Sequence, residues 1–164
     1  MCRGSRLEVN SRERYTRFWK LLLGTSSVCH LVQNIRGNYG VMSTVLIVDD
    51  SQTLRQMLSE LLQDQGIKVI EATNGLEAKE CIQSSIPDLV ITDLIMPQMN
   101  GYELCRWIKN EPSTQNLPVL ICSTKSEEFD RYWGMKQGAD AYITKPFHPP
   151  ELLRTVKHLL RGIK

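Results

Sequence analysis

Hydrophobic and polar positions follow an alternating pattern from Thr44 onward. Short continuous runs of aliphatic and β-branched residues, of which Thr44–Val48 is the first, alternate with longer stretches whose apolar residues recur every three or four positions. The short runs predict buried strands, and the 3.6-residue periodicity predicts helices that pack by one face. We expect strands at 44–48, 68–72, 88–92, 118–122 and 141–144, and helices at 51–65, 75–83, 101–110, 127–137 and 151–160.

The ends of these elements carry signals of their own. Ser51 stands where a helix N-cap is expected, Gly66 follows the same helix, and Pro149 and Pro150 precede the last one. Five strands alternating with five helices predict an α/β, doubly wound fold, because parallel neighbouring strands need crossover helices. In such sheets the ligand site lies at the carboxyl ends of the strands.

Residues 1–41 do not continue the alternation. Ser11–Leu23 has the pattern of a basic amphipathic helix, after which the periodicity is lost. Three interpretations are open: a disordered or loosely docked arm, a helix that binds a partner or a membrane surface, and an extension produced by a start codon placed too early. Met42 stands two residues before the first strand, which favours the misplaced start codon. We therefore divide the chain into an extension at 1–41 and one domain at 42–164.

Charge separates the same two parts of the chain. Residues 1–41 carry a net charge of +5 and residues 42–164 one of −3, within an overall +2. The acidic part lacks a basic stripe, which argues against nucleic-acid binding. No apolar run approaches the roughly 20 residues needed to span a bilayer. Five scattered cysteines without a CxxC pair read as reduced thiols, so we expect a cytoplasmic protein.

Chemistry-bearing residues gather where the predicted strands end. They are Asp49 and Asp50 after the first strand, Asp93 after the third, Ser123 and Thr124 after the fourth, and Lys145 after the fifth. Three carboxylates at one sheet edge would repel one another unless a cation lay between them. An all-oxygen site with few protein ligands suits Mg²⁺, which is therefore the expected cofactor.

These residues favour phosphoryl transfer onto a carboxylate. Asp93 would attack in line, while the metal and the Lys145 ammonium stabilise the equatorial oxygens of the phosphoryl group. The Ser123 hydroxyl could donate a hydrogen bond to one of those oxygens. The resulting acyl phosphate is chemically labile, which suits a reversible signal.

Four motifs then identify a family. They are VDD at 48–50, DLIMPQMNG at 93–101, PVLICST at 118–124 and GADAYITKPF at 138–147. In this order and spacing they resemble the receiver domain of response regulators, the CheY-like family, over residues 44–162. The resemblance implies a flavodoxin-like, five-stranded parallel sheet of strand order 2-1-3-4-5 with five helices.

The resemblance also implies the roles of individual residues at the phosphorylation site. A histidine kinase would phosphorylate Asp93, and Mg²⁺ would bind Asp50, Asp93 and the backbone carbonyl of Ile95, with Asp49 acting through water. Lys145 would contact the phosphoryl group, and its bond to the following proline would be cis.

Two further residues would form the switch. On phosphorylation the Ser123 hydroxyl would move toward the phosphoryl group and Tyr142 would turn inward, which remodels the face of the fourth helix, fifth strand and fifth helix for a downstream protein. A further hypothesis is that the bulky Ile95 shields the acyl phosphate and lengthens its lifetime.

The expected function is that of a stand-alone response regulator in a two-component phosphorelay. The chain ends soon after the fifth helix, so we expect the output to be an interaction surface, and the WGMKQGA stretch at 133–139 resembles the motility-linked group. Catalysis would be limited to its own phosphorylation and slow dephosphorylation. Alternatives are a phosphorelay intermediate, a non-phosphorylated scaffold, and an aspartyl phosphohydrolase, which Ile95 disfavours because it occupies the position of the general acid.

Overall fold

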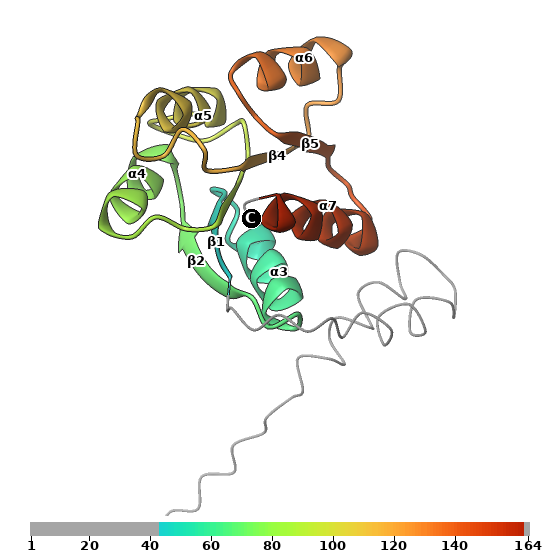
Figure 1. Ribbon diagram of the computed structural model, residues 1–164. Helices are drawn as coiled ribbons and strands as arrows, with labels where there is room; N and C mark the ends of the chain where they lie inside the picture. Colours follow the sequence, from blue (N-terminus) through green and yellow to red (C-terminus); the bar gives the residue numbers. More distant parts are fainter. Residues whose placement is uncertain (1–42, 163–164) are drawn as a thin grey trace, which may run out of the picture. The chain divides into compact units, whose positions relative to one another are not determined.

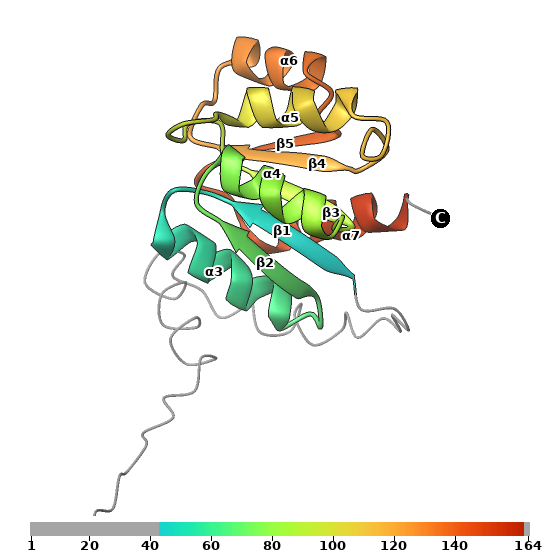
Figure 2. The same ribbon diagram turned by 90° about the vertical axis from the view of Figure 1, so that its left-hand side faces the viewer.

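A computed structural model describes residues 43–162, which form a parallel sheet between two layers of helices (Figures 1 and 2). The strands are β1 (Thr44–Val48), β2 (Lys68–Ala72), β3 (Leu89–Thr92), β4 (Val119–Ser123) and β5 (Ala141–Thr144). The helices are α3 (Gln52–Gln63), α4 (Gly75–Ser84), α5 (Gly101–Asn110), α6 (Glu128–Lys136) and α7 (Pro149–Arg161). The expected extension at 1–41, with its helix at Ser11–Leu23, lies outside the described residues.

The strand order is β2-β1-β3-β4-β5, and every neighbouring pair is parallel. Helices α3 and α7 cover one face of the sheet, and α4, α5 and α6 lie on the other (Figure 1). The doubly wound α/β fold and its strand order are therefore confirmed. The order reverses between β1 and β3, so a ligand site is expected at the carboxyl ends of these two strands.

The continuous apolar runs are strands because the sheet is covered on both faces. Every residue of β3 and β4 is buried, as are the last four of β1. One core cluster joins residues of these strands, such as Val90 and Ile121, to Leu104 and Ile108 of α5. The central strands are thereby held rigidly, so the residues that follow them have well-defined positions.

All the predicted boundaries of these strands and helices agree with the structure to within two residues. Helix α7 begins at Pro149, two residues earlier than predicted. Proline is tolerated there because the N–H groups of the first helical turn have no acceptor within the helix, so the missing N–H breaks no hydrogen bond. Ser51 caps α3 as predicted, with its hydroxyl accepting from Leu54 N at 3.4 Å. Of the helices in residues 43–162, none is long and apolar enough to cross a membrane.

Candidate functional site: an acidic cluster at the carboxyl edge of the sheet

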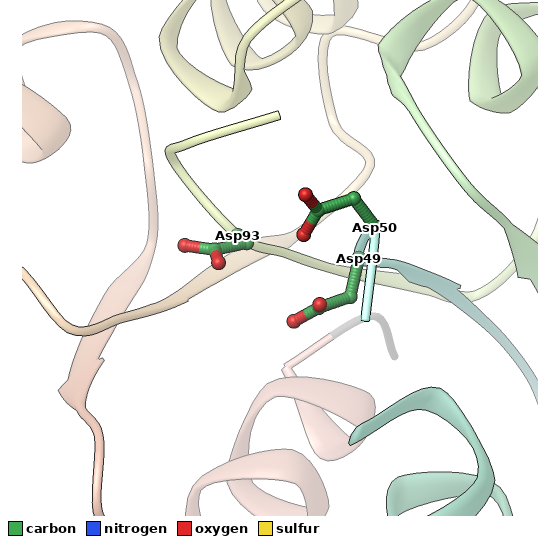
Figure 3. Close-up of side chains that lie close together, drawn as sticks. All are labelled: Asp49, Asp50 and Asp93. Atoms are coloured by element: carbon green, nitrogen blue, oxygen red, sulfur yellow. The ribbon is translucent and has the colours of Figure 1, made fainter. Parts of the chain in front are cut away.

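The register of β1 and β3 brings two of the predicted carboxylates together. Val48 lies opposite Thr92, and the chain leaves both strands in parallel, with Asp93 N donating to Val48 O at 2.9 Å. Asp49 and Asp50 follow β1, and Asp93 follows β3 (Figure 3). One carboxylate oxygen from each of the three lies within 4.8 Å of the others. The sheet thus assembles the acidic cluster predicted from the sequence.

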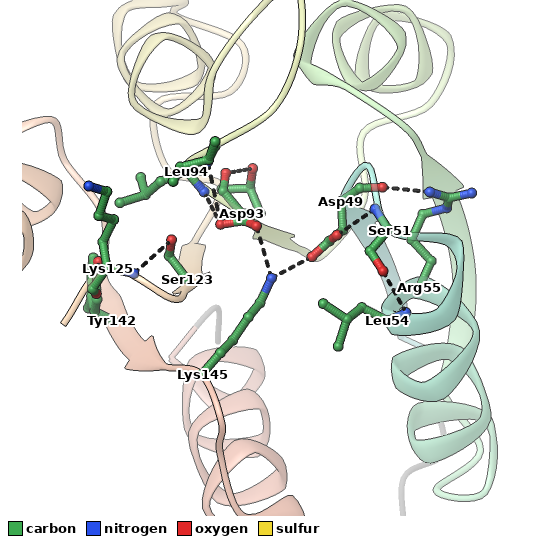
Figure 4. A network of polar contacts seen from close by, with 12 residues as sticks. Asp49, Ser51, Leu54, Arg55, Asp93, Leu94, Ser123, Lys125, Tyr142 and Lys145 are labelled. Carbon is green, nitrogen blue, oxygen red and sulfur yellow. Dashed lines mark hydrogen bonds and ion pairs between the residues drawn. The ribbon is translucent and has the colours of Figure 1, made fainter.

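Lys145 joins this cluster from the end of β5 (Figure 4). Its Nζ donates to Asp49 Oδ2 at 2.6 Å and to Asp93 Oδ2 at 3.0 Å, and its side chain is only 6% exposed. Burial alone would lower the pKa of the ammonium, but the hydrogen bonds and charges of Asp49 and Asp93 outweigh it and raise the pKa above its usual value. Lys145 is therefore held in its charged form beside the Asp93 carboxylate.

The two carboxylates that follow β1 have different surroundings. Asp49 is buried, and its Oδ1 accepts from Ser51 N at 2.9 Å while its Oδ2 accepts from Lys145. Asp50 is exposed, and its carboxylate makes no hydrogen bond or ion pair with any residue in 43–162. Asp50 is consequently the more available direct ligand, which agrees with the indirect, water-mediated role expected of Asp49.

Asp93 is held by the loop that follows it. Its Oδ1 accepts from Leu94 N at 2.6 Å and faces Ile95 N at 3.4 Å. The loop then returns, with Gly101 N donating to Leu94 O at 3.1 Å. A β-carbon on Gly101 would collide with the backbone carbonyl oxygen of Asp93. Only glycine therefore lets α5 begin so close to Asp93, a role that the sequence analysis did not identify.

The donor set of the acidic cluster fits Mg²⁺. Three carboxylates face one nearby ammonium, which leaves an excess of negative charge, and all candidate ligand atoms are oxygens. Asp50 and Asp93 are the predicted direct ligands, and their carboxylates lie close enough together that they could hold such an ion. The side chain of Ile95 is 54% exposed, and its backbone lies next to the Asp93 carboxylate. The use of its carbonyl as a ligand stays a prediction.

Ser123 and Tyr142 meet at the backbone of one residue, Lys125 (Figure 4). Lys125 N donates to Ser123 Oγ at 3.4 Å, and the Tyr142 hydroxyl donates to Lys125 O at 2.7 Å. Ser123 is fully buried and Tyr142 is 5% exposed, so in this structure the ring already has the inward position that was expected to follow phosphorylation. Burial raises the pKa of Tyr142 to about 12. The loop between β4 and α6 thus connects the two residues expected to form a switch.

Comparison with known proteins gives the family. The response regulator receiver domain matches residues 45–157, and the chain belongs to this family. Protein PilH of Pseudomonas aeruginosa is 38% identical over 121 residues, which cover 74% of this chain and 100% of PilH. The phosphate regulon transcriptional regulatory protein PhoB of Rhizobium meliloti is 36% identical over 124 residues, and the chain covers only 55% of its length.

Solved structures agree with this assignment. The chemotaxis response regulator CheY4 of Vibrio cholerae superposes with a TM-score of 0.69 at 35% identity, over 73% of this chain and 99% of CheY4. The predicted membership of the CheY-like family is confirmed by these matches. The chain is a response-regulator receiver, a signalling module of two-component systems.

Proposed function

We propose that this protein accepts a phosphoryl group on Asp93 from a histidine kinase and signals through phosphorylation-dependent protein contacts. One observation carries the proposal: the Asp93 carboxylate lies with Asp49 and Asp50 at the carboxyl edge of the sheet and is bonded to the Lys145 ammonium. A single aspartate at this edge would be a common loop residue. Three carboxylates converging with one buried lysine are chemically costly to maintain without a function.

The proposed reaction transfers the phosphoryl group from a phosphohistidine to Asp93. An Asp93 carboxylate oxygen forms the new O–P bond as the N–P bond breaks, and the electron pair of that bond returns to the imidazole. Asp50 and Asp93 would hold Mg²⁺, which when bound would neutralise negative charge on the phosphoryl oxygens. Lys145 offers its ammonium to an equatorial oxygen, and Asp49, itself bonded to Lys145 and Ser51, orients that ammonium.

The switch would act through the Lys125 backbone. If Ser123 Oγ turns to donate to the phosphoryl group, its contact with Lys125 N is lost. Because the Tyr142 hydroxyl bonds to Lys125 O, movement of this loop would be transmitted to the ring and to α6. We expect the downstream protein to read the resulting change on the face formed by α6, β5 and α7.

A role in motility is the more specific part of the proposal. The resemblance of the WGMKQGA stretch to motility-linked receivers and the likeness to a chemotaxis response regulator support it. Helix α6, which contains the start of this stretch, exposes Phe129, Tyr132, Trp133 and Met135. Aromatic residues are common anchors of protein interfaces, so this helix is suited to bind a protein.

Phosphorylation with acetyl phosphate and Mg²⁺ tests the proposal. We expect the intact protein to gain the mass of one phosphoryl group, and Asp93→Asn to abolish the gain. Asp64→Asn is the matched control, because Asp64 is an exposed aspartate at the end of α3. Steady release of phosphate without a stable adduct would support a phosphohydrolase instead. No adduct on the wild-type protein would support a scaffold.

The lifetime of the adduct tests the hypothesis on Ile95. Its exposed side chain follows the acceptor by two positions and could obstruct an approaching water molecule. We expect Ile95→Asn to accelerate dephosphorylation several-fold, measured by the decay of the mass adduct after the phosphodonor is removed. An unchanged decay rate would refute shielding by Ile95.

A further inference from the structure

The Arg55 side chain links three segments beside the acidic cluster. It extends from the first turns of α3 and is only 12% exposed (Figure 4). Its Nη1 donates to the backbone carbonyl of Asp49 at 2.6 Å, and its Nε lies 3.4 Å from Oε2 of Glu71 on β2. A largely buried guanidinium thus spans from the end of β1 to β2.

The carbonyl that Arg55 binds belongs to the peptide unit joining Asp49 to Asp50. The orientation of that peptide determines the direction in which the Asp50 side chain leaves the backbone. Other contacts hold the Asp49 carboxylate, which accepts from Ser51 N and Lys145 Nζ. The Asp50 carboxylate has no such partner among residues 43–162, so its direction depends on the backbone that Arg55 holds.

The second contact of Arg55 connects this support to β2. Glu71 precedes Ala72, whose carbonyl accepts from Asp49 N at 3.2 Å. The loop after β1 is therefore attached to the end of β2 twice, once directly and once through the Arg55–Glu71 pair. A guanidinium can make both contacts because its donors point in fixed, different directions, whereas a lysine ammonium is a single point charge.

We propose that Arg55 is a positioning residue for the magnesium site, holding the Asp49–Asp50 peptide so that the Asp50 carboxylate faces Asp93. The inference rests on the proposed function, since it assigns Asp50 and Asp93 as the metal ligands. Groups that orient metal ligands typically change metal affinity 10- to 100-fold when they are removed.

Charge and position predict opposite signs for the loss of Arg55. A cation near the acidic cluster repels Mg²⁺, so removal of its charge alone would tighten Mg²⁺ binding. Loss of the backbone contact would instead let the Asp50 side chain turn away and weaken binding. The sign of the change in affinity therefore separates a positioning role from a purely electrostatic one.

Calorimetric titration of the full-length protein with MgCl₂ alone measures this affinity. We expect the dissociation constant to rise roughly 10-fold in Arg55→Gln and also in Arg55→Lys, which keeps the charge. Arg154→Gln, which removes an exposed arginine on α7, is the matched control and should leave the affinity unchanged. Unchanged or tighter binding by Arg55→Gln and Arg55→Lys would overturn the inference.

Two further observations separate the possible failures. If the wild-type protein itself shows no saturable Mg²⁺ binding, the proposed metal site is wrong, whatever Arg55 does. If urea unfolding shows that the Arg55 variants do not fold, the Mg²⁺ affinity of Glu71→Gln tests the positioning role instead. This titration is made in about 1 M KCl, so that the loss of the Glu71 charge is screened. A several-fold weaker affinity supports the positioning role, and an unchanged affinity overturns it.

Discussion

The ring of Tyr142 packs directly against the backbone of Gly134. A β-carbon at position 134 would lie 3.1 Å from Cδ2 of Tyr142 and 3.0 Å from Cδ1 of Ile121. Of the nine described residues of α6, only Gly134 is buried. The absence of a side chain here therefore allows α6 to approach β4 and β5 and leaves room for the inward ring of Tyr142.

Gly134→Ala should lower the free energy of unfolding by about 1 kcal/mol. The alanine gains about 1 kcal/mol of helix propensity, but overpacking against Ile121 and Tyr142 costs about 2 kcal/mol. Urea unfolding measures the difference, with Met135→Ala as the control, because Met135 is 46% exposed on the same helix. A stabilised Gly134→Ala would show that the contact with Tyr142 is not close.

Gly101→Ala should lower the free energy of unfolding and the rate of phosphorylation more than the same change at Gly162. The β-carbon at 101 would meet the Asp93 carbonyl, which lies in a rigid loop, so we expect a loss of at least about 2 kcal/mol and slower phosphorylation of Asp93. At Gly162 the nearest atom, Leu159 O, would lie 3.6 Å away, and little change is expected. Urea unfolding and the rate of adduct formation would measure the two effects. Equal effects at both glycines would contradict this account.

Lys145→Met should destabilise the protein in a manner that Mg²⁺ partly reverses. Removal of the ammonium leaves the buried Asp49 carboxylate uncompensated, at an expected cost of about 3 kcal/mol. Saturating Mg²⁺ would restore part of this loss, because the ion binds the folded site. Thermal unfolding with and without MgCl₂ measures both effects, and the exposed Lys68→Met is the control. A variant as stable as the wild type would contradict the prediction.

Alkaline pH should destabilise the protein through its buried thiols. Burial raises the pKa of Cys122, and likewise of Cys105, from about 9 to about 12. A pKa raised in the folded state gives stability that is complete below pH 9 and is lost as the pH rises toward 12. Between pH 8 and pH 10.5 each buried thiol should lower the free energy of unfolding by about 2 kcal/mol.

Guanidinium unfolding at the two pH values tests this dependence. Cys122→Ala should be less stable than the wild type at pH 8 but should lose less stability on going to pH 10.5. The raised pKa of Tyr142 adds a smaller loss of stability at pH 10.5, because the pKa of an unfolded tyrosine is near 10 and thus higher than that of an unfolded cysteine. An equal loss in Cys122→Ala and the wild type would show that Cys122 does not couple to unfolding.

Local patterns in the sequence were sufficient to predict the doubly wound α/β class, and the family resemblance supplied the strand order. The bounds of β1, β2, β5 and α5 agree with the structure residue for residue, because apolar runs and caps act within a few positions of the chain. Helix α7 begins two residues earlier than predicted, because Pro149 and Pro150, which were expected to start the helix, are themselves its first two residues. The domain division at residue 42 stays a prediction.

The candidate site was predictable as a set of positions. Asp49, Asp50, Asp93 and Lys145 each follow a strand, and the carboxyl ends of parallel strands share one edge of the sheet. Motif order and spacing then identified the receiver family, which the comparisons confirmed. The chemical roles of these residues remain predictions for the experiments above.

Tertiary structure alone decided which groups touch. Lys145 bonds to Asp49 across 96 positions of sequence, Arg55 reaches the carbonyl of Asp49, and Gly134 makes room for Tyr142. Such contacts depend on how separate elements pack, which no local periodicity encodes. The sequence by itself therefore determined the elements of this protein and the chemistry available at one sheet edge, whereas packing decided how that chemistry is oriented and connected to α6.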